Sequence, residues 1–124
     1  MAGVEMEKSV RHVTYTDKHR RLVESGIDAI REVLLSADER EKDSVLLCLD
    51  RYLDSYFGVC LPYQNEIIAL LQECLFCPNT MSMKEDILRM LSEYATCPLD
   101  VLEARFSALE VSLQEEARRI LSEP

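Results

Sequence analysis

The chain carries the stretch Lys42-Asp43-Ser44-Val45-Leu46-Leu47-Cys48-Leu49-Asp50-Arg51-Tyr52 and, 42 residues later, Lys84-Glu85-Asp86-Ile87-Leu88-Arg89-Met90-Leu91-Ser92-Glu93-Tyr94. In this register the lysines and the tyrosines coincide, and four apolar positions recur at helical spacing. A period of about 40 residues is typical of stacked helical hairpins, in which each hairpin buries its apolar face against its neighbours. The repeat therefore predicts a scaffold for binding and supplies no chemistry of its own.

A third and weaker copy follows. Residues 114–123 align with residues 84–93 at an offset of 30, and Arg118 stands where the second copy has Leu88. We interpret the third unit as a cap with a more polar outer face. The sequence thus predicts three hairpins, at about residues 16–57, 62–96 and 99–122, within a single domain over residues 16–124. Residues 1–15 lack helical periodicity and are expected to form a flexible tail.

The composition favours helices, since the 124 residues are 48% hydrophobic and include only 3 glycines and 4 prolines. The first helix is expected to run from the N-cap Thr16 to about Leu35, with Gly26 tolerated inside it by close packing. The second is expected to end at Phe57, with Tyr56 on its apolar side and Gly58 after it.

The remaining boundaries come from proline and from capping patterns. Pro62 is expected to open the third helix. Capping boxes predict the start of the fourth helix at Ser82 with Glu85 and of the sixth at Ser112 with Glu115. The fifth helix is predicted over about Leu99 to Leu109.

The leading helix that ends in Leu34-Leu35-Ser36-Ala37-Asp38, followed by Asp43-Ser44-Val45-Leu46-Leu47-Cys48-Leu49, resembles the armadillo and HEAT families of helical repeats. Residues 70–80 and 91–95 resemble the same pattern again. The resemblance implies an all-α, right-handed superhelical stack, an α-solenoid fragment that binds proteins or peptides without catalysis. The second helices lack the row of asparagines found in peptide-binding armadillo proteins, so recognition through such a row is not expected.

The charge of the chain limits the class of partner. The net charge is −9, and residues 22–124 alone carry 9 basic and 20 acidic side chains. Nucleic acid is not expected as a partner, because its binding depends on Lys and Arg contacts to phosphates. A protein or peptide segment with some basic character is the expected partner. No segment has the length of a signal peptide or a membrane span, so an intracellular location, cytoplasmic or nuclear, is expected.

The groove formed by the second helices is the predicted binding surface. The candidate partner-binding residues all lie on these helices: Arg51 and Tyr52 in the first unit, Arg89, Glu93 and Tyr94 in the second, and Arg118 in the third. Two alternatives stay open. One is a compact six-helix adaptor bundle that self-associates in the manner of death-fold modules. Self-association through exposed terminal hairpins is a related possibility for the stack.

The other alternative is a metal or redox protein built on Cys74 and Cys77, which have CxxC spacing. The repeat register instead places Cys74 opposite Val33 in the core and Cys77 opposite Ser36 in a turn, so packing is the preferred interpretation. His12 and His19 are expected to be exposed and solvated. Because no phosphate loop, GxSxG or HExxH motif occurs, neither an enzyme nor a cofactor is predicted.

Overall fold

The computed structural model describes residues 14–95 and 97–122, and every regular element within them is helical. The predicted tail over residues 1–15 lies outside this range except for Thr14 and Tyr15. The elements in chain order are α2 (Asp17–Glu24), α3 (Ile27–Leu34), α4 (Glu39–Leu53), α5 (Gln64–Cys74), α6 (Met81–Tyr94), α7 (Asp100–Ala104), the 3-10 helix η1 (Phe106–Ala108) and α8 (Val111–Ser122). The all-α class predicted from composition is confirmed.

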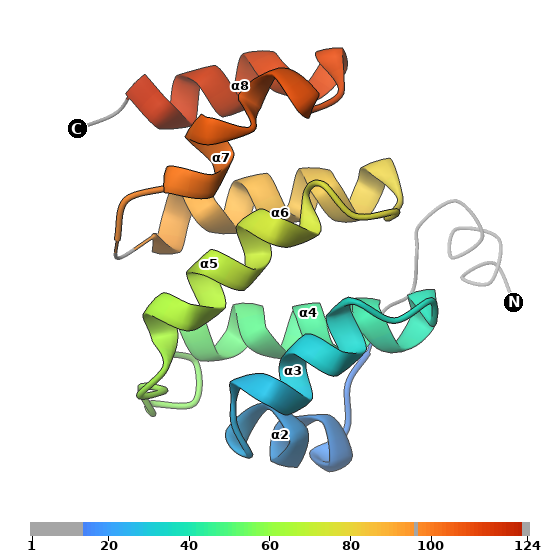
Figure 1. The fold of residues 1–124 in the computed structure, drawn as a ribbon. Helices are drawn as coiled ribbons and strands as arrows, with labels where there is room; N and C mark the ends of the chain where they lie inside the picture. Colours follow the sequence, from blue (N-terminus) through green and yellow to red (C-terminus); the bar gives the residue numbers. More distant parts are fainter. Residues whose placement is uncertain (1–13, 96, 123–124) are drawn as a thin grey trace, which may run out of the picture.

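The helices lie in two rows (Figure 1). One row contains α2, α4, α6 and α8, in which α4 contacts both α2 and α6, and α6 contacts α8 as well. The other row contains α3, α5 and α7, and α5 contacts both of its neighbours. The first and last helices of the longer row, α2 and α8, lie at opposite ends of the molecule (Figure 1). The longer row holds all three copies of the repeated segment.

The apolar positions that recur in the sequence form the core. Val45 and its counterpart Ile87 are both fully buried, and Leu49 and Leu91 are exposed by no more than 1%. Burying a side chain of this size stabilises the folded chain by roughly 1.5–3 kcal/mol. In the third copy Ala117 is fully buried. The repeat therefore specifies one apolar seam along the second helices of the predicted hairpins.

Two buried lysines link successive units in the same way. Lys42, at the start of α4, donates from Nζ to Asn79 Oδ1 at 2.7 Å, and Asn79 lies just before α6. Its counterpart Lys84, at the start of α6, donates from Nζ to Glu110 Oε2 at 2.6 Å, and Glu110 lies just before α8. Both lysines are less than 7% exposed. A buried ammonium needs a partner of this kind, so the aligned lysines connect each second helix to the entry of the next.

The single first helix expected over residues 16–35 is wrong, because the chain breaks between α2 and α3. Gly26 has φ +134° and ψ 172°, a conformation essentially reserved for glycine. A Cβ atom added at Gly26 would meet nothing within 4 Å, so close packing does not explain this residue. Backbone conformation explains it, and the break lets α2 turn back along α4.

The second helix also ends earlier than expected, at Leu53. Ser55 adopts a left-handed conformation with φ 61°, and the N–H groups of Ser55 and Tyr56 donate to the carbonyls of Tyr52 and Arg51. These bonds are those of a Schellman motif, which satisfies the carbonyls at the end of the helix. Tyr56 consequently leaves the predicted apolar side and is 65% exposed.

Both predicted capping boxes are wrong. The hydroxyl of Thr80 accepts from the N–H of Met83, so α6 begins two residues before the predicted cap Ser82. Helix α8 begins at Val111, which places Ser112 inside its first turn. At the start of α6, the Thr80 hydroxyl accepts from a free N–H group of the first turn, so the helix begins before Ser82.

The fifth helix is shorter than the predicted Leu99 to Leu109. It comprises α7, and the chain tightens into η1 after Arg105. The N–H of Leu102 donates to the side-chain oxygen of buried Gln72 in α5, which fixes α7 against that helix. The predicted separation of the last stretch into two helical segments is confirmed. The third helix begins at Gln64, so Pro62 lies in the turn before it.

His19 is buried rather than solvated, with 7% of its surface exposed. Its Nε2 lies 3.2 Å from a carboxylate oxygen of Glu41, and its Nδ1 accepts from the N–H of Thr16 at 3.1 Å. The histidine thus joins the start of α2 to the first turn of α4. A turn of α2 packed against α4 buries this ring, which sequence pattern alone assigned to the solvent. His12 lies outside the described residues.

Candidate partner-binding grooves

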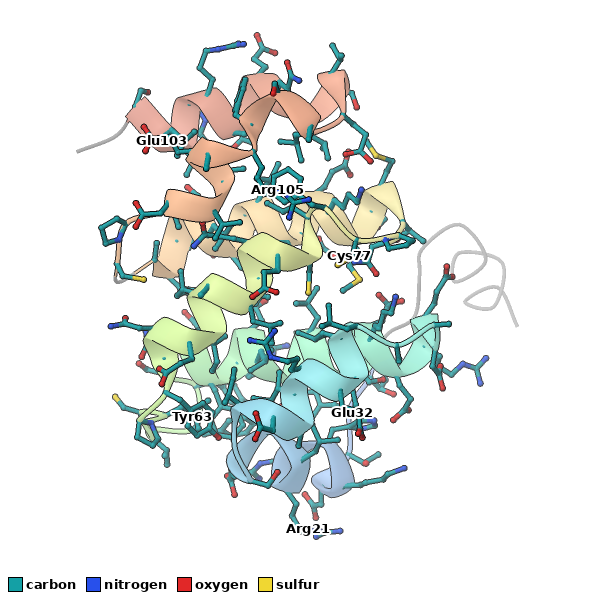
Figure 2. All side chains as sticks on the ribbon, in the orientation of Figure 1. Arg21, Glu32, Tyr63, Cys77, Glu103 and Arg105 are labelled. Atoms are coloured by element: carbon teal, nitrogen blue, oxygen red, sulfur yellow. The ribbon has the colours of Figure 1, made fainter. Side chains whose placement is uncertain are left out.

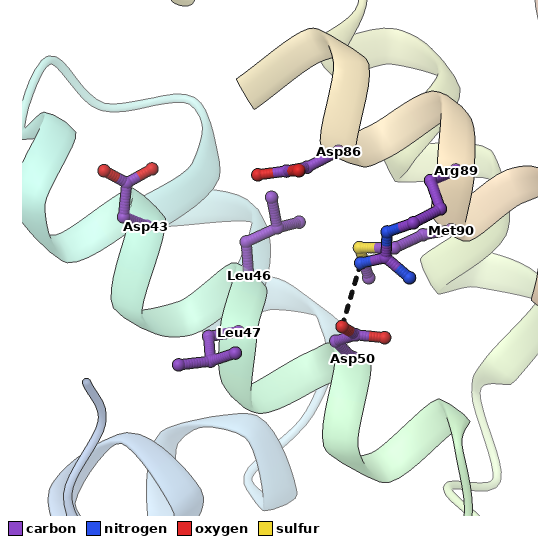
Figure 3. A pocket seen from close by; sticks show the side chains of 7 residues that line it. All are labelled: Asp43, Leu46, Leu47, Asp50, Asp86, Arg89 and Met90. Atoms are coloured by element: carbon purple, nitrogen blue, oxygen red, sulfur yellow. Dashed lines mark hydrogen bonds and ion pairs between the residues drawn. The ribbon is translucent and has the colours of Figure 1, made fainter. Parts of the chain in front are cut away.

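The first groove lies between α4 and α6 and has a volume of about 200 Å³. Figure 3 shows its lining, in which three carboxylates and one guanidinium surround a short apolar floor. The lining residues are Asp43, Leu46, Leu47, Asp50, Asp86, Arg89 and Met90. The groove therefore combines apolar contact area with an excess of negative charge.

A second groove, of about 440 Å³, lies between α6 and α8. Adding 42 to each α4 residue of the first groove gives a residue of the second: Glu85, Leu88, Arg89 and Ser92. Adding 30 to Asp86 and Arg89 gives Glu116 and Arg119, which also line it. Glu93, Ser112 and Leu113 complete the lining. The two grooves are built from aligned positions of the repeat.

Asp50 is the centre of a polar cluster on the first groove. Arg89 donates from Nη2 to Asp50 at 2.9 Å and from Nη1 to Glu93 at 2.8 Å, and its side chain is 45% exposed. The Tyr94 hydroxyl donates to the other Asp50 oxygen at 2.7 Å. Burial, followed by the hydrogen bond to Asp50 and its negative charge, raises the pKa of Tyr94 well above its ordinary value. Tyr94 therefore stays a hydrogen-bond donor at all physiological pH values.

Three predicted partner-binding residues, Arg89, Glu93 and Tyr94, come together in this cluster. Tyr52 does not join them, because it is 3% exposed and its hydroxyl donates to Glu24 of α2. Burial is the main cause that raises the Tyr52 pKa. The two tyrosines are nevertheless used alike, since each donates to a carboxylate on the preceding helix of the row.

The two remaining predicted residues lie apart from the cluster. Arg51 is exposed, and its guanidinium carbon is 5.3 Å from the ring centroid of Tyr56. Arg118 is exposed on α8, with its guanidinium carbon 5.2 Å from the ring centroid of Phe106. Each guanidinium shields an aromatic ring of its own unit, an arrangement worth about 0.5–1 kcal/mol at exposed sites.

Sequence reasoning missed the acidic residues of the first groove, Asp43 and Asp50. They are seven residues apart, so they lie on one face of α4, and this spacing is the signal that could have found them. Figure 3 shows both carboxylates on the side of α4 that faces α6. The shared tyrosine position, from which binding residues were predicted, instead selected Tyr52, which is buried.

Cys74 and Cys77, which have CxxC spacing, lie in different environments. Cys74 is fully buried, and burial raises the pKa of its thiol to about 12. Cys77 lies half-buried in the turn after α5 and donates from Sγ to the carbonyl of Glu73 at 3.4 Å. None of the five cysteines is disulfide-bonded. Within residues 14–95 and 97–122, no group of three or more His, Cys, Asp or Glu side chains is placed to hold a metal ion.

Among the same described residues, no helix has the length and apolar character needed to cross a membrane. The chain matches no protein-family model, and no curated protein or solved structure matches it.

Proposed function

We propose that the chain is a non-catalytic protein-interaction module, an armadillo- or HEAT-like α-solenoid fragment, that binds a basic segment of another protein across α4, α6 and α8. One observation carries the proposal: the two grooves between these helices are lined by aligned residues, and acidic side chains recur in both. A surface repeated along a stack presents the same contacts to successive parts of one extended ligand.

The charge of the grooves supports a basic ligand. The first groove is lined by three carboxylates, Asp43, Asp50 and Asp86, and by Arg89, whose guanidinium is shared between Asp50 and Glu93. The net charge of the chain has the same sign, at −9. Clefts lined by one sign of charge concentrate ligands of the opposite sign and speed their association.

The arrangement of the helices favours this proposal over a self-associating six-helix bundle. A closed bundle would bring the first and last helices together, whereas α2 and α8 lie at opposite ends of the molecule (Figure 1). The linkage of each unit to the next by Lys42 and Lys84 supports a stack that extends in one direction.

The test is a selection from a displayed library of random peptides, followed by affinity measurements on the selected sequences. We expect the selected peptides to be enriched in Lys and Arg, and their affinity to fall with rising salt. The double variant Asp43→Asn with Asp86→Asn should weaken binding by about tenfold, since each rim charge contributes modestly.

A matched control keeps the change in charge but moves it to the other row of helices. Asp28→Asn with Glu32→Gln alters two exposed carboxylates on α3; Figure 2 labels Glu32 there. This variant should bind the selected peptides as the unaltered chain does. Equal losses in both double variants would mean that overall charge, and not the groove, attracts the peptide.

A further inference from the structure

A third cavity lies between the carboxyl ends of α6 and α8 and measures about 400 Å³. Polar groups contribute the larger part of its surface, although seven of its ten lining residues are apolar by type: Leu91, Ala95, Cys97, Pro98, Leu99, Ile120 and Leu121. Ser92, Asp100 and Glu103 are its polar side chains, and none of the described residues that line it is basic. Its volume falls within the roughly 300–1,000 Å³ typical of ligand pockets.

The repeat identifies what this cavity corresponds to in the preceding unit. Leu91, Ser92 and Ala95 of α6 align with Leu49, Asp50 and Leu53 of α4. At that end of α4, Tyr94 reaches across from α6 and donates to Asp50. The third copy has Pro124 at the position of Tyr94, and proline has neither an aromatic ring nor a hydroxyl group. The aligned sequence thus supplies no tyrosine for the cavity beside Ser92.

We propose that this cavity receives an aromatic side chain of the partner segment, with a basic residue next to it in the partner's sequence. The inference rests on the proposed function, because the aromatic residue belongs to the same basic segment. Tyr94 on Asp50 is the template for the aromatic group: an aromatic ring against apolar side chains, with its hydroxyl directed at the polar residue of the preceding helix. Aromatic anchors in desolvated pockets are the residues that dominate binding energy at interfaces.

Charge complementarity is the reason for placing a basic residue next to the aromatic residue in the partner segment. Asp100 and Glu103 are exposed carboxylates on α7, and Figure 2 shows Glu103 beside the carboxyl end of α8. The cavity also shares Ser92 with the groove between α6 and α8. A segment lying in that groove can therefore reach the cavity without leaving the surface of the second helices.

The test uses the probe acetyl-Gly-Tyr-Arg-Gly-amide, titrated into the isotope-labelled full chain and followed by NMR. We expect the amide signals of Leu91, Ala95, Leu99 and Leu121 to shift. Replacing Tyr by Ala or Arg by Glu in the probe should weaken binding, by about tenfold for the aromatic ring.

Variants of the cavity separate binding from folding. Ala95→Trp fills the cavity and should abolish the shifts at Leu99 and Leu121, whereas Ala37→Trp, at an exposed alanine between α3 and α4, should leave them unchanged. Ala95→Leu introduces the residue of the first copy and provides a smaller obstruction if the tryptophan variant fails to fold. Ser92→Asp restores the acceptor present at Asp50, so it should strengthen binding of the Tyr probe relative to a matched Phe probe.

The outcomes distinguish this inference from the proposed function. If basic peptides bind at Asp43 and Asp86 but the Tyr probe shifts nothing around the cavity, the inference is wrong and the proposed function stands. Equal binding of the Tyr and Ala probes would also overturn the inference. If neither the basic peptides nor the Tyr probe binds, both are overturned.

Discussion

Two junctions, α4 with α6 and α6 with α8, are built from aligned residues. They differ where the helices reach their carboxyl ends. Asp50 accepts a hydrogen bond from Tyr94 across the first junction, whereas the aligned Ser92 lines the cavity between the carboxyl ends of α6 and α8. The loops differ too, since ten residues (54–63) follow α4 and five (95–99) follow α6. The repeat thus accounts for the middle of each second helix, whereas the contacts at its carboxyl end differ between the copies.

The largest expected losses of stability come from substitutions at aligned core positions. They test whether the central parts of the three second helices contribute equally to stability. Leu49→Ala and Leu91→Ala should each lower the free energy of unfolding by about 3 kcal/mol, because both side chains are fully packed. The third copy has Leu121, which is half-buried, and Leu121→Ala should cost about 1 kcal/mol. Urea denaturation followed by circular dichroism measures all three. Equal losses at Leu49, Leu91 and Leu121 would mean that the third unit is no weaker than the others.

The next effect concerns the two glycines of the first unit that have a positive φ. Gly26→Ala should destabilise the chain by about 2 kcal/mol through backbone strain alone, since a Cβ atom meets no neighbour there. Gly58→Ala, at φ +70°, occupies a left-handed region that alanine enters at a cost of about 1 kcal/mol. Thermal or urea unfolding of the two variants gives the comparison. A larger loss at Gly58 than at Gly26 would contradict the conformational explanation of the break between α2 and α3.

Tyr94→Phe removes the hydroxyl that closes the first junction and makes it resemble the second. The loss of one hydrogen bond to the Asp50 carboxylate should lower the free energy of unfolding by about 1.5 kcal/mol, since hydrogen bonds to charged groups contribute more than neutral ones. Tyr56→Phe is the matched control, because its ring is 65% exposed. The same urea measurement applies, and an equal change in both variants would remove the distinction between the junctions.

The smallest expected effect is the pH dependence of stability that arises from the Lys84–Glu110 link and is absent from the Lys42–Asn79 link. Hydrogen bonding from Lys84 lowers the pKa of Glu110 below its ordinary value of 4.5, so the ionised carboxylate is favoured in the folded chain. The stabilisation is therefore present above pH 4.5 and lost as the pH falls through the lowered pKa. Because Glu110 is exposed, we expect about 0.5 kcal/mol or less.

Lys84→Met should remove this part of the pH dependence, whereas Lys42→Met should retain it because Asn79 does not titrate. The measurement is the difference in unfolding free energy between neutral pH and about pH 3 for each variant. Identical pH dependence in the Lys84 variant and the unaltered chain would show that the link to Glu110 contributes nothing.

The sequence predicted the middles of α4 and α6 well, because apolar residues at Val45, Leu49, Ile87 and Leu91 recur at helical spacing and all are buried. It predicted the helix ends poorly. Thr80 and Ser82 can both cap a helix, and the path of the chain leaving α5 decides between them. The positive φ of Gly26 leaves no trace in the spacing of apolar residues, so the break between α2 and α3 could not be predicted from the sequence.

The candidate site was predicted in part. Arg89, Glu93 and Tyr94 lie together, but their common partner Asp50 was missed because a carboxylate on a helix surface is ordinarily a solvated group. The burial of Tyr52 and of His19 depends on α2 packing against α4, a contact set by the turn at Gly26. Tertiary contacts of this kind decide which face of a helix remains open, and local pattern does not contain them.

The measurement that tests the central claim most directly is an NMR titration of the labelled chain with a selected basic peptide. Binding in the repeated grooves predicts shifts of the amide signals along both edges of α6, from Asp43 to Asp50 in α4 and from Glu116 to Arg119 in α8. Shifts confined to α3 and α5, on the other row of helices, would contradict the account.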